Sequence, residues 1–259
     1  MNKMSTDFRN TIHNLLSKGK RLSARPLDGF RNVVVEYDVT RNAEGSARVK
    51  IGDTEVMAGV KLEVGTPYPD TPDQGGIMVN VELLPLSNPE FEPGPPGIDA
   101  IELSRVTDRG IRESKAIDVK KLCIAPGEKA WTVIIDVVTI NYDGNLFDAI
   151  ALAAMAALKD TKFPEYKDGT IDYKKKTDKS LPLEKTPIAV TVYKYGDALL
   201  IDPDFDEDKA YDSRLSVAVM ENGELCSLQK GGAGAISVDG VNDMIQLAIK
   251  KSGELRKHL

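Results

Sequence analysis

The sequence of 259 residues is poor in histidine and cysteine, with two of each. His13 and His258 lie near opposite ends of the chain. Zinc sites and nucleophilic triads are built largely from these residue types, so the sequence has almost no material for either. Cys123 and Cys226 are far apart. Two widely separated cysteines favour a reduced cytosolic interior over a disulfide framework.

Long apolar runs and an excess of positive charge are also missing. No stretch approaches the length of a membrane span, and the polar start Met1–Thr6 does not resemble a signal peptide, so we expect a cytoplasmic protein without a membrane partner. The 34 basic residues are outnumbered by 40 acidic ones, which gives a net charge of −6. No overall field therefore attracts nucleic acid, and any polyanion must be held by a local basic cluster.

The hydrophobic pattern predicts strands followed by helices in two successive parts of the chain. A short amphipathic helix is expected over 4–19, an arginine-containing helix over about 98–118 and an apolar helix over 146–159. The strands expected before the last of these helices are Val33–Val39, Ala47–Ile51, Glu55–Val64, Ile77–Leu84, Lys121–Ile124 and Ala130–Asn141.

A second strand-rich part follows a polar stretch over about 162–185 that is interpreted as a connector. Its expected elements are the strands Ile188–Tyr195, Ala198–Ile201, Leu215–Met220 and Leu225–Gln229, and a helix from about Val238 to the C-terminus. The repeated order suggests an internal duplication. We divide the chain into an N-terminal extension (1–30), a first unit (31–165), a connector (166–186) and a second unit (187–259).

The arginines of the helix predicted over 98–118 form the most informative local pattern. The stiff Pro/Gly loop Phe91–Gly97 leads into this helix, and Arg105, Arg109 and Arg112 follow at spacings of four and three. These spacings place three guanidinium groups on one helical face. Arginine suits phosphate oxygens because its planar fork donates two hydrogen bonds at once. The alternative is a solvated face on which Glu102 and Asp108 pair with these arginines, at about 0.3–0.5 kcal/mol per pair.

Four other clusters have simpler interpretations. The acidic residues between Asp202 and Asp208 are interpreted as a solvated loop, because the spacing of a calcium loop is missing. Lys174–Lys176 lacks interleaved aromatic residues and is interpreted as a soluble loop. Gly231–Gly234 lacks a dinucleotide fingerprint and is interpreted as a turn, and Phe91–Gly97 as a rigid structural turn. No metal site and no cofactor are expected.

Several segments resemble the RNase PH superfamily, and the resemblance covers nearly the whole chain. They are Gly45–Gly52, Asn80–Pro85, Phe91–Pro96, Ile101–Arg105, Trp131–Asp136 and Asp202–Asp204. The Phe-Glu-Pro-Gly-Pro-Pro sequence is similar in particular to non-catalytic ring subunits of archaeal exosomes. One departure lies in Arg21–Arg25, where related chains usually have Asp-Gly before the second arginine and this chain has Ser23 and Ala24.

The resemblance implies an α+β fold of duplicated β-α units, of the ribosomal protein S5 domain 2-like type, with mixed sheets and packed helices. It also implies a heterodimer with a catalytic RNase PH-like exosome subunit, a ring of three such dimers around single-stranded RNA, and RNA-binding cap proteins on that ring. In relatives, the helix with the arginine row lines the RNA path. Arg105, Arg109 and Arg112 are therefore predicted to bind RNA.

Two positions differ from those of active relatives, which hold phosphate with Gly-Ser-Arg or Gly-Thr-Arg at a helix start. The matching residues here are Gly144, Asn145 and Leu146, and leucine supplies no charge. Active relatives also carry an aspartate in Ala-Asp-x-Pro-Val-Ala and another six residues upstream. Arg214 stands at the first of these positions, whereas Asp208 remains at the second. No catalytic residue is therefore predicted.

These residues predict a non-catalytic structural subunit of an RNA-degrading ring that helps to shape its partner's active site. One alternative is an active phosphorolytic exoribonuclease that degrades RNA from 3′ to 5′, against which Leu146 and Arg214 argue. Another is a generic RNA-binding scaffold without an enzyme partner. Co-expression followed by gel filtration separates the last case, because an obligate interface survives dilution.

Overall fold

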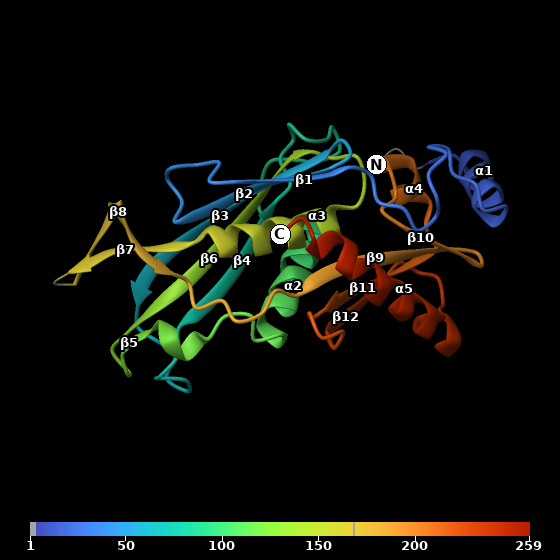
Figure 1. Cartoon of the computed structure of the whole chain (residues 1–259). Coiled ribbons are helices and arrows are strands. Elements are labelled where there is room, and N and C mark those ends of the chain that lie inside the picture. Colours follow the sequence, from blue (N-terminus) through green and yellow to red (C-terminus); the bar gives the residue numbers. More distant parts are fainter. Residues whose placement is uncertain (1–3, 168) are drawn as a thin grey trace.

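The computed structural model describes residues 4–167 and 169–259, which fold into three β-sheets and five α-helices (Figure 1). The first sheet has the strand order β1-β2-β3-β6-β4, and β5 pairs with β6. Its pairs are antiparallel except β4–β6, which is parallel. The strands are β1 (Val33–Tyr37), β2 (Gly45–Ile51), β3 (Thr54–Gly65), β4 (Gly76–Glu82), β5 (Cys123–Ala125) and β6 (Lys129–Asn141).

The second sheet is antiparallel, with the order β10-β9-β11-β12, and a third sheet pairs β7 with β8. The strands are β7 (Lys162–Lys167), β8 (Thr170–Ser180), β9 (Ile188–Tyr195), β10 (Ala198–Ile201), β11 (Ser213–Val219) and β12 (Leu225–Gly231). The helices are α1 (Thr6–Ser17), α2 (Ile98–Glu113), α3 (Leu146–Asp160), α4 (Phe205–Ala210) and α5 (Val238–Arg256), with a 3-10 turn η1 (Val119–Leu122). This mixed α+β architecture agrees with the expected fold class.

Helix α3 joins the two larger sheets into one core. Its apolar sequence is buried along almost its whole length, and it contacts β2 and β3 on one side and β9 on the other. The alanines of α3 allow this close approach. At Gly45 a Cβ would lie 2.4 Å from the carbonyl oxygen of Ala157, so only glycine fits between β2 and α3. Helix α5 covers the other side of β9 and β11, and α2 contacts β4, α3 and β12.

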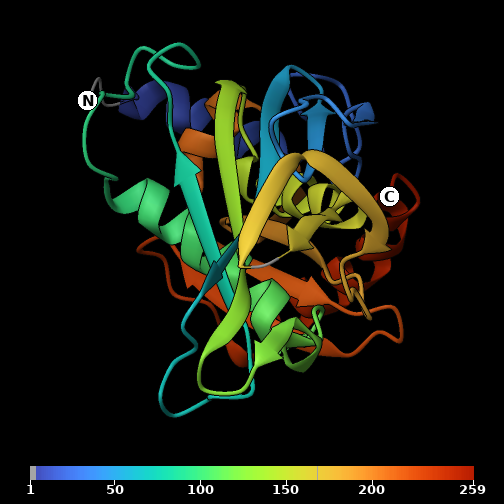
Figure 2. The same cartoon turned by 90° about the vertical axis from the view of Figure 1, so that its left-hand side faces the viewer.

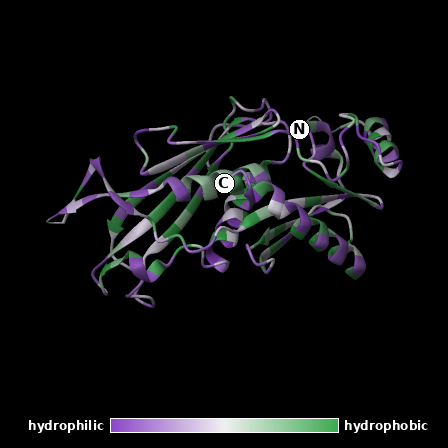
Figure 3. Ribbon diagram, in the orientation of Figure 1, coloured by the Kyte–Doolittle hydropathy of each residue, from purple (hydrophilic) through white to green (hydrophobic). Residues whose placement is uncertain are grey.

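Three segments differ clearly from their sequence-based interpretation, and one of them includes Lys174–Lys176, which lie in strand β8 rather than in a loop. The helix predicted over 98–118 ends at Glu113, where Lys115 takes a left-handed conformation with φ of 54°. The polar connector instead contains the β7–β8 hairpin, because Phe163 and Tyr166 pack their rings against Trp131. Hydrophilic residues dominate the rest of that hairpin (Figure 3).

The acidic segment between Asp202 and Asp208 is the third difference, because it is not a solvated loop. Asp204 caps helix α4, and its carboxylate accepts a hydrogen bond from the Glu207 backbone while the Glu207 side chain bonds back to the Asp204 backbone. Asp202 and Glu207 are fully buried. Among the helices of the described residues, none is long and apolar enough to cross a membrane.

Candidate functional site

The arginine row lies on the exposed face of α2, as the spacing predicts. The opposite face buries Leu103 and Ile111 against the core. Arg105, Arg109 and Arg112 are all exposed. Helix periodicity therefore separates the apolar positions, which anchor α2, from the three guanidinium groups that face outwards.

The three arginines differ in how much of their hydrogen-bonding capacity is used within the chain. Arg112 donates to both carboxylate oxygens of Asp108, at 3.1 and 2.7 Å, and to the carbonyl oxygen of Ile77 at 3.0 Å. Arg109 donates one bond to the side-chain oxygen of Gln229 at 2.9 Å. Across residues 4–167 and 169–259, no hydrogen bond or salt bridge to Arg105 is found. Pairing within the helix thus occupies Arg112 but leaves Arg105 available.

The turn before α3 is tightly packed and leaves no room for a larger first residue. Gly144 has φ of 87°, and a Cβ there would lie 2.4 Å from the carbonyl oxygen of Pro203. Asn145 is buried in a left-handed conformation at the N-cap position of α3, where its side chain makes no capping hydrogen bond. The side chain of Leu146 is buried within the hydrophobic core. This turn therefore retains the backbone of an anion-binding helix start but presents no cationic side chain.

A carboxylate of the chain itself lies at this helix start. The Asp208 Oδ2 atom accepts a hydrogen bond from the backbone N–H of Asn145 at 3.2 Å and another from the Tyr142 hydroxyl at 2.9 Å. Burial raises the pKa of Asp208, although these two bonds and the charge of Arg214 oppose the shift. Burial also raises the pKa of Tyr142, so its hydroxyl stays protonated and donates. Asp208 thus uses the first amide of the turn that would face a bound anion.

Arg214 is almost completely buried on β11 and forms an ion pair with α2. Its Nη2 atom lies 2.7 Å from the Glu102 carboxylate, and its guanidinium carbon lies 3.8 Å from the centre of the Phe147 ring. Its Nη1 atom has no hydrogen-bond partner among the described residues. Glu102 therefore pairs with Arg214 rather than with the arginines of its own helix.

Three arginines of the N-terminal segment converge on the loop between β10 and α4. Asp202 accepts hydrogen bonds from Arg25 at 3.0 Å, from Arg31 at 2.8 Å and from Asn145 at 2.9 Å. Burial alone would raise the pKa of Asp202, but the bonds and charge of Arg31 outweigh it, so its pKa lies below the usual range. The buried Arg21 pairs with Glu207 at 2.5 Å.

These contacts are present although Ser23 and Ala24 stand where related chains usually have Asp-Gly. Ala24 takes the left-handed conformation, with φ of 58°, that glycine would adopt more readily. Arg21 and Arg25 nevertheless both donate to the backbone carbonyl of Asp202, at 2.7 and 3.1 Å. Sequence reasoning missed this cluster, although the recurrence of arginine at 21, 25 and 31 was an available signal.

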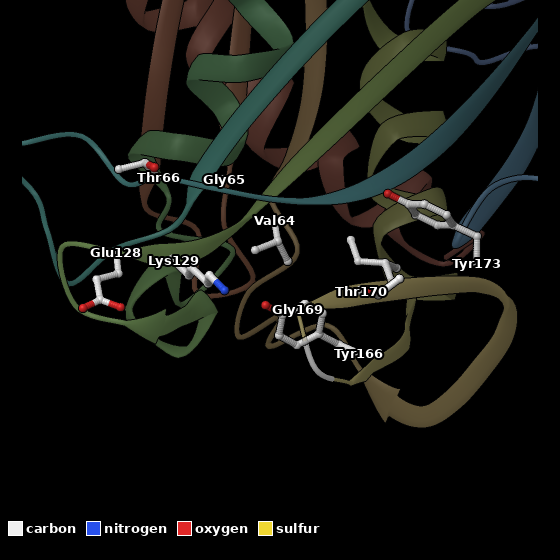
Figure 4. Close-up of a pocket in the computed structure, with 10 residues that line it drawn as sticks. Val64, Gly65, Thr66, Glu128, Lys129, Tyr166, Gly169, Thr170 and Tyr173 are labelled. Atoms are coloured by element: carbon white, nitrogen blue, oxygen red, sulfur yellow. The ribbon is translucent and has the colours of Figure 1, made fainter.

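A cavity of about 490 Å³ lies elsewhere, beside the β7–β8 hairpin (Figure 4). Lys129 points into it, and Tyr166 and Tyr173 line its walls. In Figure 1 this hairpin and helix α4 are at opposite ends of the molecule.

A larger cavity, of about 730 Å³, is lined by Tyr142, Leu146 and Asp208, and its lining carries more acidic than basic side chains. Each cation that lines it is paired with an acid: Arg9 with Asp212, Lys209 with Glu90, and Arg214 with Glu102, each at 2.7 Å. Asp99 and Asp208 also line it. Phosphate entering this cavity would therefore meet an excess of negative charge. Within residues 4–167 and 169–259, no group of three or more His, Cys, Asp or Glu is placed to hold a metal ion.

Each of the two strand-rich units matches a domain of a known protein family. Residues 29–164 match the profile of the 3′ exoribonuclease family, domain 1, and residues 185–251 match its domain 2. The chain therefore belongs to the 3′ exoribonuclease (RNase PH) family, as its motifs predict.

Proteins that are similar over nearly the whole chain give a more specific comparison than the family models. The chain is 48% identical to "Exosome complex component Rrp42" of Methanocella arvoryzae, over 97% of this chain and 95% of the relative. It is 46% identical to the protein of the same name from Thermococcus gammatolerans, over 99% and 95%. A chain of the Archaeoglobus fulgidus exosome with RNA bound to the active site superimposes with a TM-score of 0.90 at 42% identity, covering 97% of both chains. A rice Rrp46 structure, at 18% identity and a TM-score of 0.69, shares the fold.

Proposed function

We propose that this protein is a structural subunit of a cytoplasmic exosome ring and has no catalytic activity of its own. It pairs with a catalytic RNase PH-like subunit, and three such pairs form a hexameric ring that degrades single-stranded RNA from 3′ to 5′. Cap proteins that bind RNA complete the complex. Similarity over nearly the full length to exosome components named Rrp42 supports this role.

The arrangement at the Gly144 turn is the observation that carries the proposed lack of activity. Phosphorolysis needs a phosphate nucleophile and acidic groups that manage charge at the scissile bond. Leu146 is buried where active relatives place an arginine, and Asp208 already accepts from the amide at the helix start. Arg214 is a buried cation where those relatives place an acid. Each group that phosphate would need is missing or already bonded within the chain.

Exposed apolar side chains support a permanent protein partner. Strand β4 is an edge of the first sheet, and α2 lies beside it (Figure 2). Large apolar residues that remain exposed on these elements and the loops next to them are Tyr68, Met78, Leu86, Ile98 and Ile101. Ile98 is 85% exposed and Leu86 is 79% exposed, which is costly unless another chain covers them. An unpaired sheet edge adds to this need.

We assign the RNA contact of this subunit to Arg105, Arg109 and Arg112. All three are exposed on one face of α2, on a protein whose net charge is otherwise negative. Phosphate contacts of this kind hold RNA without reading its sequence.

Reconstitution with the catalytic partner tests the proposal. The isolated chain should release no nucleoside diphosphates from single-stranded RNA in phosphate buffer. Mixing it with the catalytic subunit should produce a hexamer in gel filtration and phosphate-dependent degradation. A phosphate-free reaction is the control, because it detects contaminating hydrolytic nucleases.

Phosphate-dependent degradation by the pure, isolated chain would refute the inactive role and favour an active exoribonuclease. Failure to form a complex with the catalytic subunit, together with RNA binding by the chain alone, would favour a scaffold without an enzyme partner.

A further inference from the structure

Arg214 does more than fill the position of a missing acid, because its surroundings are built around its guanidinium group. Strand β11 carries Arg214 opposite Gly231 of β12. A Cβ at Gly231 would lie 2.5 Å from the guanidinium carbon, so any other residue there would displace it. The Phe147 ring covers the group at 3.8 Å. The glycine at the start of the Gly231–Gly234 cluster therefore makes room for an arginine.

The buried Arg214 guanidinium group binds one residue of α2, Glu102. Its Nη2 atom lies 2.7 Å from the Glu102 carboxylate, and the Arg214 side chain is 4% exposed whereas that of Glu102 is 30% exposed. The Coulomb attraction within an ion pair is stronger when one side is shielded from water than when the pair is exposed. The planar fork of the arginine also fixes the orientation of the carboxylate. The guanidinium group thus ties the first turns of α2 to the second sheet.

Glu102 lies on the same face of α2 as Arg105 and Arg109. Arg105 and Arg109 follow Glu102 by three and seven residues, and residues at these spacings share a helical face. Arg109 makes a second link, to Gln229 of β12. Rotation of α2 about its axis would break the Glu102–Arg214 pair and turn Arg105 and Arg109 away together.

We propose that Arg214 is a positioning residue for RNA binding, which sets the rotation of α2 through Glu102 so that Arg105 and Arg109 face the RNA. The inference rests on the proposed role in an exosome ring. It assigns a task to a side chain that otherwise marks only the loss of an acid.

The test uses the ring reconstituted with its catalytic partner and a fluorescent single-stranded polyadenylate RNA in phosphate-free buffer, where phosphorolysis cannot proceed. Binding is followed by fluorescence anisotropy at a series of salt concentrations. Arg214→Met should weaken binding by about tenfold, which corresponds to about 1.4 kcal/mol. It should also reduce the salt slope by about 0.7 for each displaced phosphate contact on a single strand. Arg214→Lys, which retains a charge for Glu102, should restore most of the affinity.

Glu102→Gln provides a second variant that keeps the shape of the helix surface. It should weaken binding as Arg214→Met does, and the double variant should lose no more than either single one, because both act through the same pair. Arg256→Met is the matched control, since Arg256 is a partly buried arginine that donates to the carbonyl of Val219 at the end of β11 but lies on α5. It should leave RNA binding unchanged.

Unchanged RNA affinity and salt slope for Arg214→Met or Glu102→Gln in an assembled ring would overturn the inference. Tighter binding by Glu102→Gln would do the same, because it would show that Glu102 only repels phosphate. These outcomes differ from failure of the proposed function, in which the native chain forms no ring with the catalytic subunit.

Discussion

The turn before α3 and the exposed face of α2 both carry charged and polar side chains, but they use them differently. At the turn, the buried charges are bonded to other residues of the same chain, as in the contacts of Asp202 with Arg25 and Arg31. On α2, Arg105 and Arg109 remain exposed, and Arg109 makes one side-chain bond. Internal pairing stabilises the fold, whereas exposed guanidinium groups remain available to a ligand.

The comparison shows that the proposed loss of catalysis at this site is compatible with keeping its structural frame. Asn145, Asp202 and Asp208 still connect α3, the β10–α4 loop and the helix α4. Removing one member of a buried polar network of this kind is costly, because it leaves the partners of that residue unpaired. The frame therefore contributes to stability, whereas the arginine row is the part that we propose to bind RNA.

The largest expected effect is on the buried pair of Arg21 and Glu207. Arg21→Met should destabilise the protein by about 3–5 kcal/mol, because it leaves the Glu207 carboxylate buried without its cation. Equilibrium urea unfolding measures this change. Arg48→Met, which removes an exposed partner of Glu36, is the control and should have little effect. Equal effects of the two substitutions would contradict the structural role of the buried charges.

Asp148 gives a pH-dependent test of the same network. This buried carboxyl accepts from the Thr191 backbone and from Asn145, and burial raises its pKa to about 8. The folded state then holds a proton that the unfolded state, with a pKa near 4, has lost. Its contribution to stability is therefore complete below about pH 4 and falls as the pH rises towards 8.

Comparison with Asp148→Asn isolates this contribution, because the asparagine oxygen can still accept from Thr191. The stability of the native protein relative to that of the variant should fall between pH 6 and 7 by up to about 1.4 kcal/mol. Urea unfolding at several pH values checks this. A difference that stays constant from pH 4 to 8 would show that Asp148 titrates normally.

The smallest expected effects concern α2. In the ring reconstituted with the catalytic partner, Arg109→Glu should weaken binding of single-stranded RNA and flatten its salt dependence, since each phosphate contact releases about 0.7 counterion. Arg105→Ala should weaken binding less because it adds no negative charge. Arg112→Ala should have the smallest effect, because its guanidinium already bonds to Asp108 and to the Ile77 carbonyl. Fluorescence anisotropy measured at a series of salt concentrations gives the order of the three effects on RNA binding.

Unchanged binding with Arg109→Glu would remove Arg109 from the RNA contact. An Arg112→Ala effect larger than that of Arg105→Ala would show that internal pairing does not decide which arginines bind.

Local sequence patterns were sufficient to predict most of the helices and strands. The alanine-rich run before Asp160 and the helix start at Ile98 were predicted within a residue or two. The end of α2 was missed, because Lys115 takes a left-handed conformation that the sequence usually marks with glycine. Helix α4 was missed although Asp204 and Glu207 have the spacing of a capping box. The β7–β8 hairpin depends on packing against Trp131, which is distant in sequence.

The spacing of Arg105, Arg109 and Arg112 alone determined that they share a face, because helix geometry is a local property. The sequence likewise led to the prediction that Leu146 and Arg214 stand at positions where active relatives carry other residues. Only the tertiary structure decided which charges are used internally. Arg214 meets Glu102, and Asp208 meets the amide of Asn145, across separations that no local pattern encodes. Such pairs depend on how the strands and helices pack together, and packing is a property of the whole fold.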